Sequence, residues 1–224
     1  MFALVGLPLP GSAQQFVDTT AAAFGDDNAK EYTHALALGD IDGDGDLDLA
    51  VSNANALAEP TAEAAVHQSR LYLNNGAGIF SDVTDERLPS APGWYRDVAF
   101  ADLDGDGDLD LLFVGGFGFE PKIFINGGDG HYLDKTKAQA PSFTGWWGGS
   151  VAIGDVEMDG DLDLYFTNAG TKTFAPPGGQ DRLWLNDGKG KFFDASDALL
   201  PKLITRASVA AAFADVDDDG DLDV

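Results

Sequence analysis

The sequence predicts an all-β fold, a β-propeller of four-stranded antiparallel blades, and two observations support this prediction. One acidic pattern, Asp-x-[Asp/Glu]-x-Asp-Gly-Asp-Leu-Asp, begins at residues 40, 102, 155 and 215. The same order of strand and hairpin patterns surrounds the successive copies. A pattern that returns at a regular interval indicates a repeat architecture rather than a domain with one special loop.

The acidic pattern itself predicts a calcium loop. Acidic residues at positions 1, 3, 5 and 9 supply hard oxygen ligands, glycine at position 6 permits a sharp turn, and the main-chain carbonyl of position 7 adds a further oxygen. We expect about one Ca²⁺ in each loop and thus up to four. The candidate metal residues are Asp40, Asp42, Asp44, Asp46 and Asp48 in the first loop, Asp102, Asp104, Asp106, Asp108 and Asp110 in the second, Asp155, Glu157, Asp159, Asp161 and Asp163 in the third, and Asp215, Asp217, Asp219, Asp221 and Asp223 in the fourth.

The residues around the loop decide which kind of calcium loop it is. An EF-hand needs a bidentate Glu at position 12 and a helix on either side. Position 12 is instead Val51, Phe113 or Phe166 in the first three copies. Large and small residues alternate before each loop, as in 36–39, and runs typical of strands follow it, as in 111–114. The loop is therefore predicted to join the first and second strands of a blade.

The rest of each repeat supplies two more strands. Hairpins of the form [Leu/Ile]-Asn-x-Gly-x-Gly stand at 73–78, 125–130 and 185–190, and their Asn and Gly residues suit tight turns. A fourth strand, aromatic-x-Asp-x-[Ser/Thr], follows each hairpin. Four short strands in about 50–60 residues is typical of a propeller blade. Alanine three positions before every loop, at 37, 99, 152 and 212, places the first strand nearest the crowded axis.

Together, the loop, the hairpin and the fourth strand resemble the FG-GAP or VCBS repeats of integrin-α-like propellers, and the nearest variety resembles bacterial exported proteins that often carry an ASPIC/UnbV segment. The resemblance extends over nearly all of the chain from residue 16 onward. It implies a calcium-stiffened propeller, commonly of seven blades, that serves adhesion or ligand binding outside the cytoplasm. Two departures stand out: Glu157 replaces Asp at position 3 of the third loop, and no ASPIC/UnbV segment is present.

The domain organisation expected from these repeats is a single propeller segment over residues 14–224. It comprises an outer strand of a partial blade at 14–20, blades at 33–84, 96–136 and 149–196, and the opening of a further blade at 207–224. About three complete blades suggest part of a longer protein. Residues 1–13 are apolar and end in small residues, which predicts the remnant of a signal peptide, with a disordered apolar tail as the alternative. We expect an extracellular, periplasmic or cell-surface location.

The charge of the chain limits the classes of partner that we expect. The formal net charge is −25, with 13 basic residues and no basic cluster. Nucleic acids and anionic membrane surfaces both need a basic footprint, so neither is expected as a partner, and no stretch predicts membrane insertion. There is no cysteine, which excludes disulfides and thiolate metal sites. Spacings typical of metal-dependent, Ser-nucleophile or phosphate-binding enzymes are absent from the sequence, and the loops account for most paired carboxylates.

Aromatic residues mark the opposite end of the first strand in each repeat. Eight residues before the first three loops stand Tyr32, Trp94 and Trp147, with Tyr95 and Trp146 adjacent. Such side chains can stack on sugar rings or hold a peptide, since they combine a large apolar face with a polar tip. The alternative is that they wedge between blades.

The function predicted from these features is that of an exported, non-enzymatic calcium-binding propeller for adhesion or for binding a protein or carbohydrate ligand. The alternative is the propeller portion of a secreted carbohydrate-active enzyme, a lyase or a hydrolase. Further partners expected are the remaining blades of a longer parent chain, or a second copy that completes the ring.

Overall fold

The computed structural model describes residues 17–25, 32–54, 68–142, 147–170, 179–202 and 207–224. Over these ranges the chain forms three four-stranded antiparallel sheets, each ordered as in the sequence, which we call blades 1, 2 and 3. The all-β prediction of four-stranded blades is thereby confirmed. Blade 1 contains β1 (Tyr32–Gly39), β2 (Asp48–Ala54), β3 (Arg70–Asn74) and β4 (Phe80–Asp82); blade 2 contains β5 (Tyr95–Ala101), β6 (Asp110–Gly115), β7 (Lys122–Asn126) and β8 (Tyr132–Asp134); blade 3 contains β9 (Gly148–Gly154), β10 (Asp163–Asn168), β11 (Arg182–Asn186) and β12 (Phe192–Asp194).

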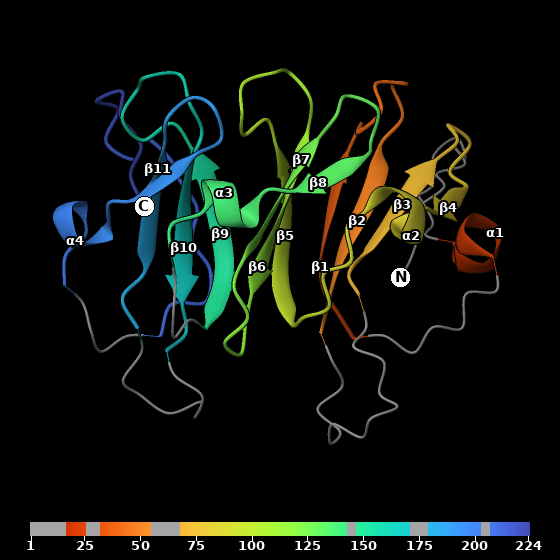
Figure 1. Ribbon diagram of the computed structural model, residues 1–224, viewed down its shortest axis with the longest axis horizontal. Helices are drawn as coiled ribbons and strands as arrows, with labels where there is room; N and C mark the ends of the chain where they lie inside the picture. Colours follow the sequence, from red (N-terminus) through yellow and green to blue (C-terminus); the bar gives the residue numbers. More distant parts are fainter. Residues whose placement is uncertain (1–16, 26–31, 55–67, 143–146, 171–178, 203–206) are drawn as a thin grey trace, which may run out of the picture.

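The first two strands of each blade bracket an acidic loop. In blade 1, Gly39 ends β1 and pairs with Asp48, the first residue of β2. Blades 2 and 3 repeat this register. The three loops therefore lie along one edge of the molecule, at the top in Figure 1. We call them loops 1, 2 and 3, and the acidic loop that begins at Asp215 loop 4.

The blades are arranged as an arc around their first strands. β5 lies between β1 and β9 and contacts both, as predicted for innermost strands, while β4 lies toward one side of the molecule (Figure 1). The alanines expected at this crowded position are present on all three strands, and Ala152 is buried.

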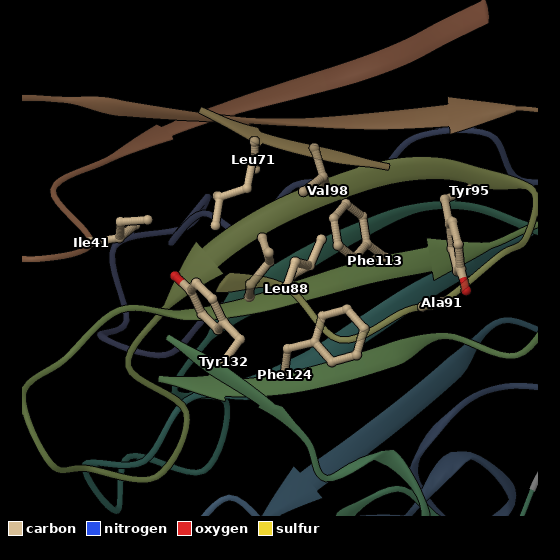
Figure 2. Packing of buried hydrophobic residues seen from close by; sticks show 11 residues of the cluster. Ile41, Leu71, Leu88, Ala91, Tyr95, Val98, Phe113, Phe124 and Tyr132 are labelled. Carbon is tan, nitrogen blue, oxygen red and sulfur yellow. The ribbon is translucent and has the colours of Figure 1, made fainter. Parts of the chain in front are cut away.

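Apolar residues from neighbouring blades form two seams. In the first seam, blade 1 contributes Ile41, Ala50 and Leu71 and blade 2 contributes aromatic residues such as Phe113 and Phe124 (Figure 2). The second seam lies between blades 2 and 3 and includes Leu103, Leu112, Ile123, Phe166 and Trp184. Blade 2 is thus covered on both faces, and all six residues of β6 are buried.

A one-turn helix follows the fourth strand of each blade: α2 (Thr84–Arg87), α3 (Thr136–Gln139) and α4 (Ser196–Leu199). The aromatic-x-Asp-x-[Ser/Thr] pattern predicted a fourth strand that continues through the Thr or Ser that begins each helix, and this prediction was wrong. In blade 1, the N–H of Thr84 donates to Asp82 Oδ1 at 2.9 Å, and this side-chain turn ends the strand at Asp82. The same aspartates also pair with a cation of their own blade, as Asp134 does with Lys122 at 3.3 Å.

The outer strand expected at 14–20 does not form over its described part. Val17 to Thr19 are in no strand, and α1 (Thr20–Phe24) follows. Asp18 Oδ1 accepts from the N–H of Thr20 at 3.0 Å, in the same kind of side-chain turn that ends β4, β8 and β12. The segment packs outside blade 1, where Phe24 stacks on Phe80 with ring centroids 4.9 Å apart. The signal-peptide prediction for residues 1–13 lies outside the described residues.

The blade opening expected at 207–224 is represented by one antiparallel bridge between Ala214 and Asp223. This pair corresponds to Gly39 and Asp48 in blade 1. The segment packs on blade 3, since a Cβ added at Gly154 would lie 2.8 Å from Leu222 Cδ1. No helix in the described part of the chain has the length and apolar character needed to cross a membrane.

Candidate metal centre

The aspartate at position 1 organises each loop. In loop 1, Asp40 Oδ1 accepts from the N–H groups of Gly43 and Asp44 at 2.9 and 3.1 Å, and Oδ2 accepts from Gly45 at 2.9 Å. The equivalent carboxylates accept the same N–H groups of positions 5 and 6 in the other loops. Glycine at position 6 has φ of 92–98° in all four loops, which a residue with a side chain rarely adopts. The turn predicted from this glycine is confirmed.

The aspartate at position 9 ties the loop to the sheet. Asp110 is the first residue of β6 and is fully buried. Its Oδ2 accepts from Leu103 N at 2.9 Å and its Oδ1 accepts from Asn126 N at 2.9 Å. Burial raises the pKa of Asp110 to about 7, against the lowering effect of these two hydrogen bonds. Burial also raises the pKa values of Asp48 and Asp163, which make the equivalent bonds.

Carboxylates of positions 1, 3 and 9 converge in three of the loops. One oxygen from each of the three residues lies within 4.8 Å of the others in Asp40–Asp42–Asp48, in Asp102–Asp104–Asp110 and in Asp215–Asp217–Asp223. The first two groups are partly buried, whereas the third is exposed. Three hard oxygens around one point are a donor set that suits Ca²⁺.

Two oxygens in these groups lack a partner and support the fit to a cation. Asp42 Oδ1 and Asp104 Oδ1 are shielded from solvent and accept no hydrogen bond. A buried oxygen without a donor is costly, and a bound cation would satisfy it. The residues present in loops 1 and 2 therefore fit a calcium ion.

Positions 5 and 7 are placed differently from positions 1, 3 and 9. The position-5 side chains, Asp44 in loop 1 and Asp106 in loop 2, accept from the N–H of position 7 at 2.9 and 3.0 Å and lie outside the converging groups. The position-7 side chains Asp46, Asp108 and Asp161 lie over the hairpin glycines Gly76, Gly128 and Gly188 of their own blades. Ligation by the position-5 carboxylates and by the position-7 carbonyls remains a prediction.

Loop 3 departs from the other loops. Among the described residues, Asp155, Glu157 and Asp163 form no converging group. Glu157 stands at position 3, and its pKa is raised by burial and by hydrogen bonding to Asp159. Position 4 also differs: its φ is positive in every loop, and loop 3 has Met158 there, at 56°. Loops 1 and 2 have glycine at this position, which was the sequence signal for the required conformation and was missed.

The hairpin asparagines are further residues that sequence reasoning missed as part of the site. Asn126 Nδ2 donates to Leu109 O of its own loop at 3.2 Å and to Ile41 O of loop 1 at 2.8 Å. Asn186 does the same toward Leu162 O and toward Leu103 O of loop 2. The hairpins of blades 2 and 3 thus each hold their own loop and the loop of the preceding blade. The Asn of the hairpin pattern was the signal, although it was interpreted only as a turn residue.

The aromatic residues at the opposite end are largely inter-blade packing. Tyr95 is 1% exposed and belongs to the first seam, and Trp147 is 4% exposed. Their predicted role as exposed ligand-binding residues is therefore corrected, because the neighbouring blades cover them. Tyr32 remains exposed, Trp94 is half-buried, and Trp146 lies outside the described residues.

Phe117 completes this packing and was not predicted. Its ring lies between Trp94 and Trp147, with centroids 4.1 and 4.2 Å away. Its φ is 55°, an uncommon value for a residue with a side chain. The glycines on either side, Gly116 and Gly118, were the available sequence signal.

Comparison with protein-family models gives two matches. A model described as an FG-GAP-like repeat matches residues 61–113 and 171–224, and a model described as an FG-GAP repeat matches residues 32–68. The matched stretches include loops 1, 2 and 4, whereas loop 3 lies outside them. A search of curated proteins found no match.

Proposed function

Since this chain belongs to the FG-GAP repeat proteins, we propose that it is a calcium-binding β-propeller module that binds a protein or carbohydrate ligand outside the cytoplasm. The observation that carries the proposal is the convergence of three carboxylates within 4.8 Å in loops 1, 2 and 4. A bound Ca²⁺ would supply charge neutralisation and a rigid cross-link between residues at both ends of the loop.

The chain's own residues would prepare each loop for the ion. The position-1 carboxylate fixes the turn through its hydrogen bonds, and the position-9 carboxylate anchors the loop to the second and third strands. Position 3 contributes the oxygen that has no other partner in loops 1 and 2. The ion would thus stabilise the folded loop, in keeping with a structural rather than a catalytic role.

The ligand-binding part of the proposal rests on the exposed residues at the opposite end of the first strands. Tyr32 of β1 is 61% exposed and His34 of the same strand is also exposed. The ring of His34 lies 6.1 Å from the ring of Trp94, which directly precedes β5. Aromatic side chains on a rigid scaffold suit sugar or peptide binding. We propose binding rather than catalysis, because the converging carboxylates belong to the loops.

Calorimetric titration of the 224-residue chain tests the calcium function. We expect uptake of Ca²⁺ at loops 1, 2 and 4, with Mg²⁺ competing poorly because it prefers a small octahedral shell and retains its waters. The matched control carries Asp40→Asn, Asp102→Asn and Asp215→Asn together and should lose this uptake. Equal affinity for the two ions, or no uptake of calcium, would refute the proposal.

Glycan and peptide arrays probed with the parent and with Tyr32→Ala test the ligand-binding face, and the variant should lose any signal that the parent shows.

A further inference from the structure

Arg87, the last residue of α2, joins loop 1 to blade 2. Its Nη1 lies 3.3 Å from Asp42 Oδ2, and it donates a hydrogen bond to the main-chain oxygen of Asp129 at 3.0 Å. The side chains of Arg87 and Asp42 are only 18% and 20% exposed. A single guanidinium therefore contacts both the position-3 carboxylate of loop 1 and the hairpin of the next blade.

The hairpin of blade 2 encloses this ion pair. Gly130 has φ of 75°, and a Cβ added there would lie 2.6 Å from Arg87 Nη1 and 3.5 Å from Asp42 Cβ. Asn126 of the same hairpin donates to Ile41 O at 2.8 Å. Because the pair is largely shielded from solvent, its Coulomb interaction is screened less than that of a surface pair.

The residue equivalent to Arg87 differs in each blade. Gln139 ends α3 in blade 2 and lies beside loop 2 in the same way, since a Cβ added at Gly190 would be 2.7 Å from Gln139 Nε2 and 3.1 Å from Asp104 Cβ. Leu199 ends α4 in blade 3 and is 59% exposed. The last residue of this helix is thus cationic in blade 1, neutral and polar in blade 2, and apolar in blade 3.

We propose that Arg87 is a built-in counter-charge of loop 1, which holds the calcium-free loop against blade 2 and makes loop 1 a weaker calcium site than loop 2. This inference rests on the proposed calcium function. Without the ion, the guanidinium offsets the repulsion among the carboxylates of the loop. With the ion, Asp42 is shared between two cations, and their mutual repulsion lowers the calcium affinity. Gln139 can position Asp104 without this repulsion.

The experiment exchanges the two residues. Arg87→Gln is made in a chain in which only loop 1 can bind calcium, and Gln139→Arg is made in a chain in which only loop 2 can. The remaining loops are disabled by Asp→Asn at position 1. Titration with CaCl₂ measures the affinity of that loop. We expect Arg87→Gln to tighten loop 1 by about threefold to tenfold and Gln139→Arg to weaken loop 2 by a similar factor. Arg87→Lys keeps the charge and should leave loop 1 close to the parent affinity.

Thermal unfolding separates this role from simple packing. In chelator, Arg87→Gln should lower the melting temperature, and saturating calcium should restore much of the loss. A packing role alone would lower the melting temperature equally in both conditions and would leave the affinity unchanged or weaker, and either result overturns the inference. If Arg87→Gln does not fold, the calcium affinities of Arg87→Lys and Gln139→Arg test the inference instead. An unaltered calcium affinity of loop 2 in Gln139→Arg would then contradict it. Absence of calcium uptake in the parent chain would instead refute the proposed function, and the inference with it.

Discussion

Loops 2 and 3 have the same residues at position 1 and at positions 5–9, and they differ at positions 2–4 and in their surroundings. Leu103, at position 2 of loop 2, is 1% exposed, and its carbonyl accepts from Asn186 of blade 3 at 2.8 Å. Val156, its counterpart in loop 3, is only half-buried. The carboxylates of loop 2 converge, and among the described residues those of loop 3 do not. The comparison indicates that the convergence of the carboxylates depends on the loop's own residues, since loop 3 has Glu157 at position 3, and that the hairpin of the following blade holds loop 2 through an additional hydrogen bond.

The largest expected effect tests the contribution of that hairpin. Asn186→Ala removes the donor for both Leu103 O and Leu162 O, which leaves carbonyl groups of two loops without partners. Each such loss costs about 1–3 kcal/mol, so we expect the free energy of unfolding to fall by roughly 3–5 kcal/mol. Urea unfolding measures this change.

The matched control is Asn74→Ala, the same residue in blade 1. Its Nδ2 donates to Leu47 O of its own loop, at 3.1 Å. We expect a loss of about 1–2 kcal/mol. Equal losses in the two variants would show that the bond to the preceding loop adds nothing.

A second prediction compares the calcium contributions of the two loops. Asp102→Asn should remove the stabilisation that calcium gives through loop 2, about 2.7 kcal/mol when the ion is in hundredfold excess over its Kd. Asp155→Asn in loop 3 should remove much less, because its neighbours Glu157 and Asp163 do not converge on it. Melting temperatures with calcium and with chelator check both variants. A larger calcium-dependent loss from Asp155→Asn would reverse the comparison.

A third prediction concerns the backbone of position 4. Met158 has φ of 56°, whereas the equivalent Gly105 has φ of 77°. Because glycine adopts positive φ without steric strain, Met158→Gly should raise the free energy of unfolding by about 1 kcal/mol, with or without calcium. Gly105→Ala should lower it by a similar amount. Chemical unfolding in chelator measures both, and a destabilised Met158→Gly would contradict the strain argument.

The last prediction is a dependence on pH in loop 2. The pKa of Asp110 is raised from 3.8 to about 7 by burial. The folded, calcium-free protein therefore binds a proton that the unfolded chain releases, and its stability falls as the pH rises from about 4 to about 7. Calcium needs the deprotonated carboxylate, so its affinity for loop 2 should increase over the upper part of this range. Calorimetry in two buffers of different ionisation enthalpy should detect proton release near pH 6.5 and little at pH 8.5.

The repeated local features could be predicted from the sequence because they depend on residues close together in the chain. Strand alternation around each acidic pattern gave the blades, and Gly at position 6 gave the turn. Glu157 was recognised as the departure in loop 3. The strand end at Asp82 was missed, since the side-chain turn to Thr84 competes with continued extension and the strand pattern alone does not show which of the two is favoured.

Other parts of the site depend on contacts between blades, and no spacing in the sequence reveals them. Arg87 meets Asp42 across 45 residues, and the ring of Phe117 packs against Trp94 and Trp147, which directly precede β5 and β9. The aromatic residues before each loop suggested an exposed binding face. Tyr95 and Trp147 are instead covered by neighbouring blades, which local sequence cannot indicate.

The bonds from Asn126 and Asn186 to the preceding loops also have a consequence for the order of folding. Asn126 follows Ile41 by 85 residues, and Asn186 follows Leu103 by 83. At synthesis rates of about 5–20 residues per second, a newly made loop waits roughly 4–17 s for the residue that holds it. During this interval the loop has only its own local bonds, and its acidic residues stay accessible to solvent. The loops of blades 1 and 2 therefore gain their last hydrogen bond only after the hairpin of the next blade has been synthesised.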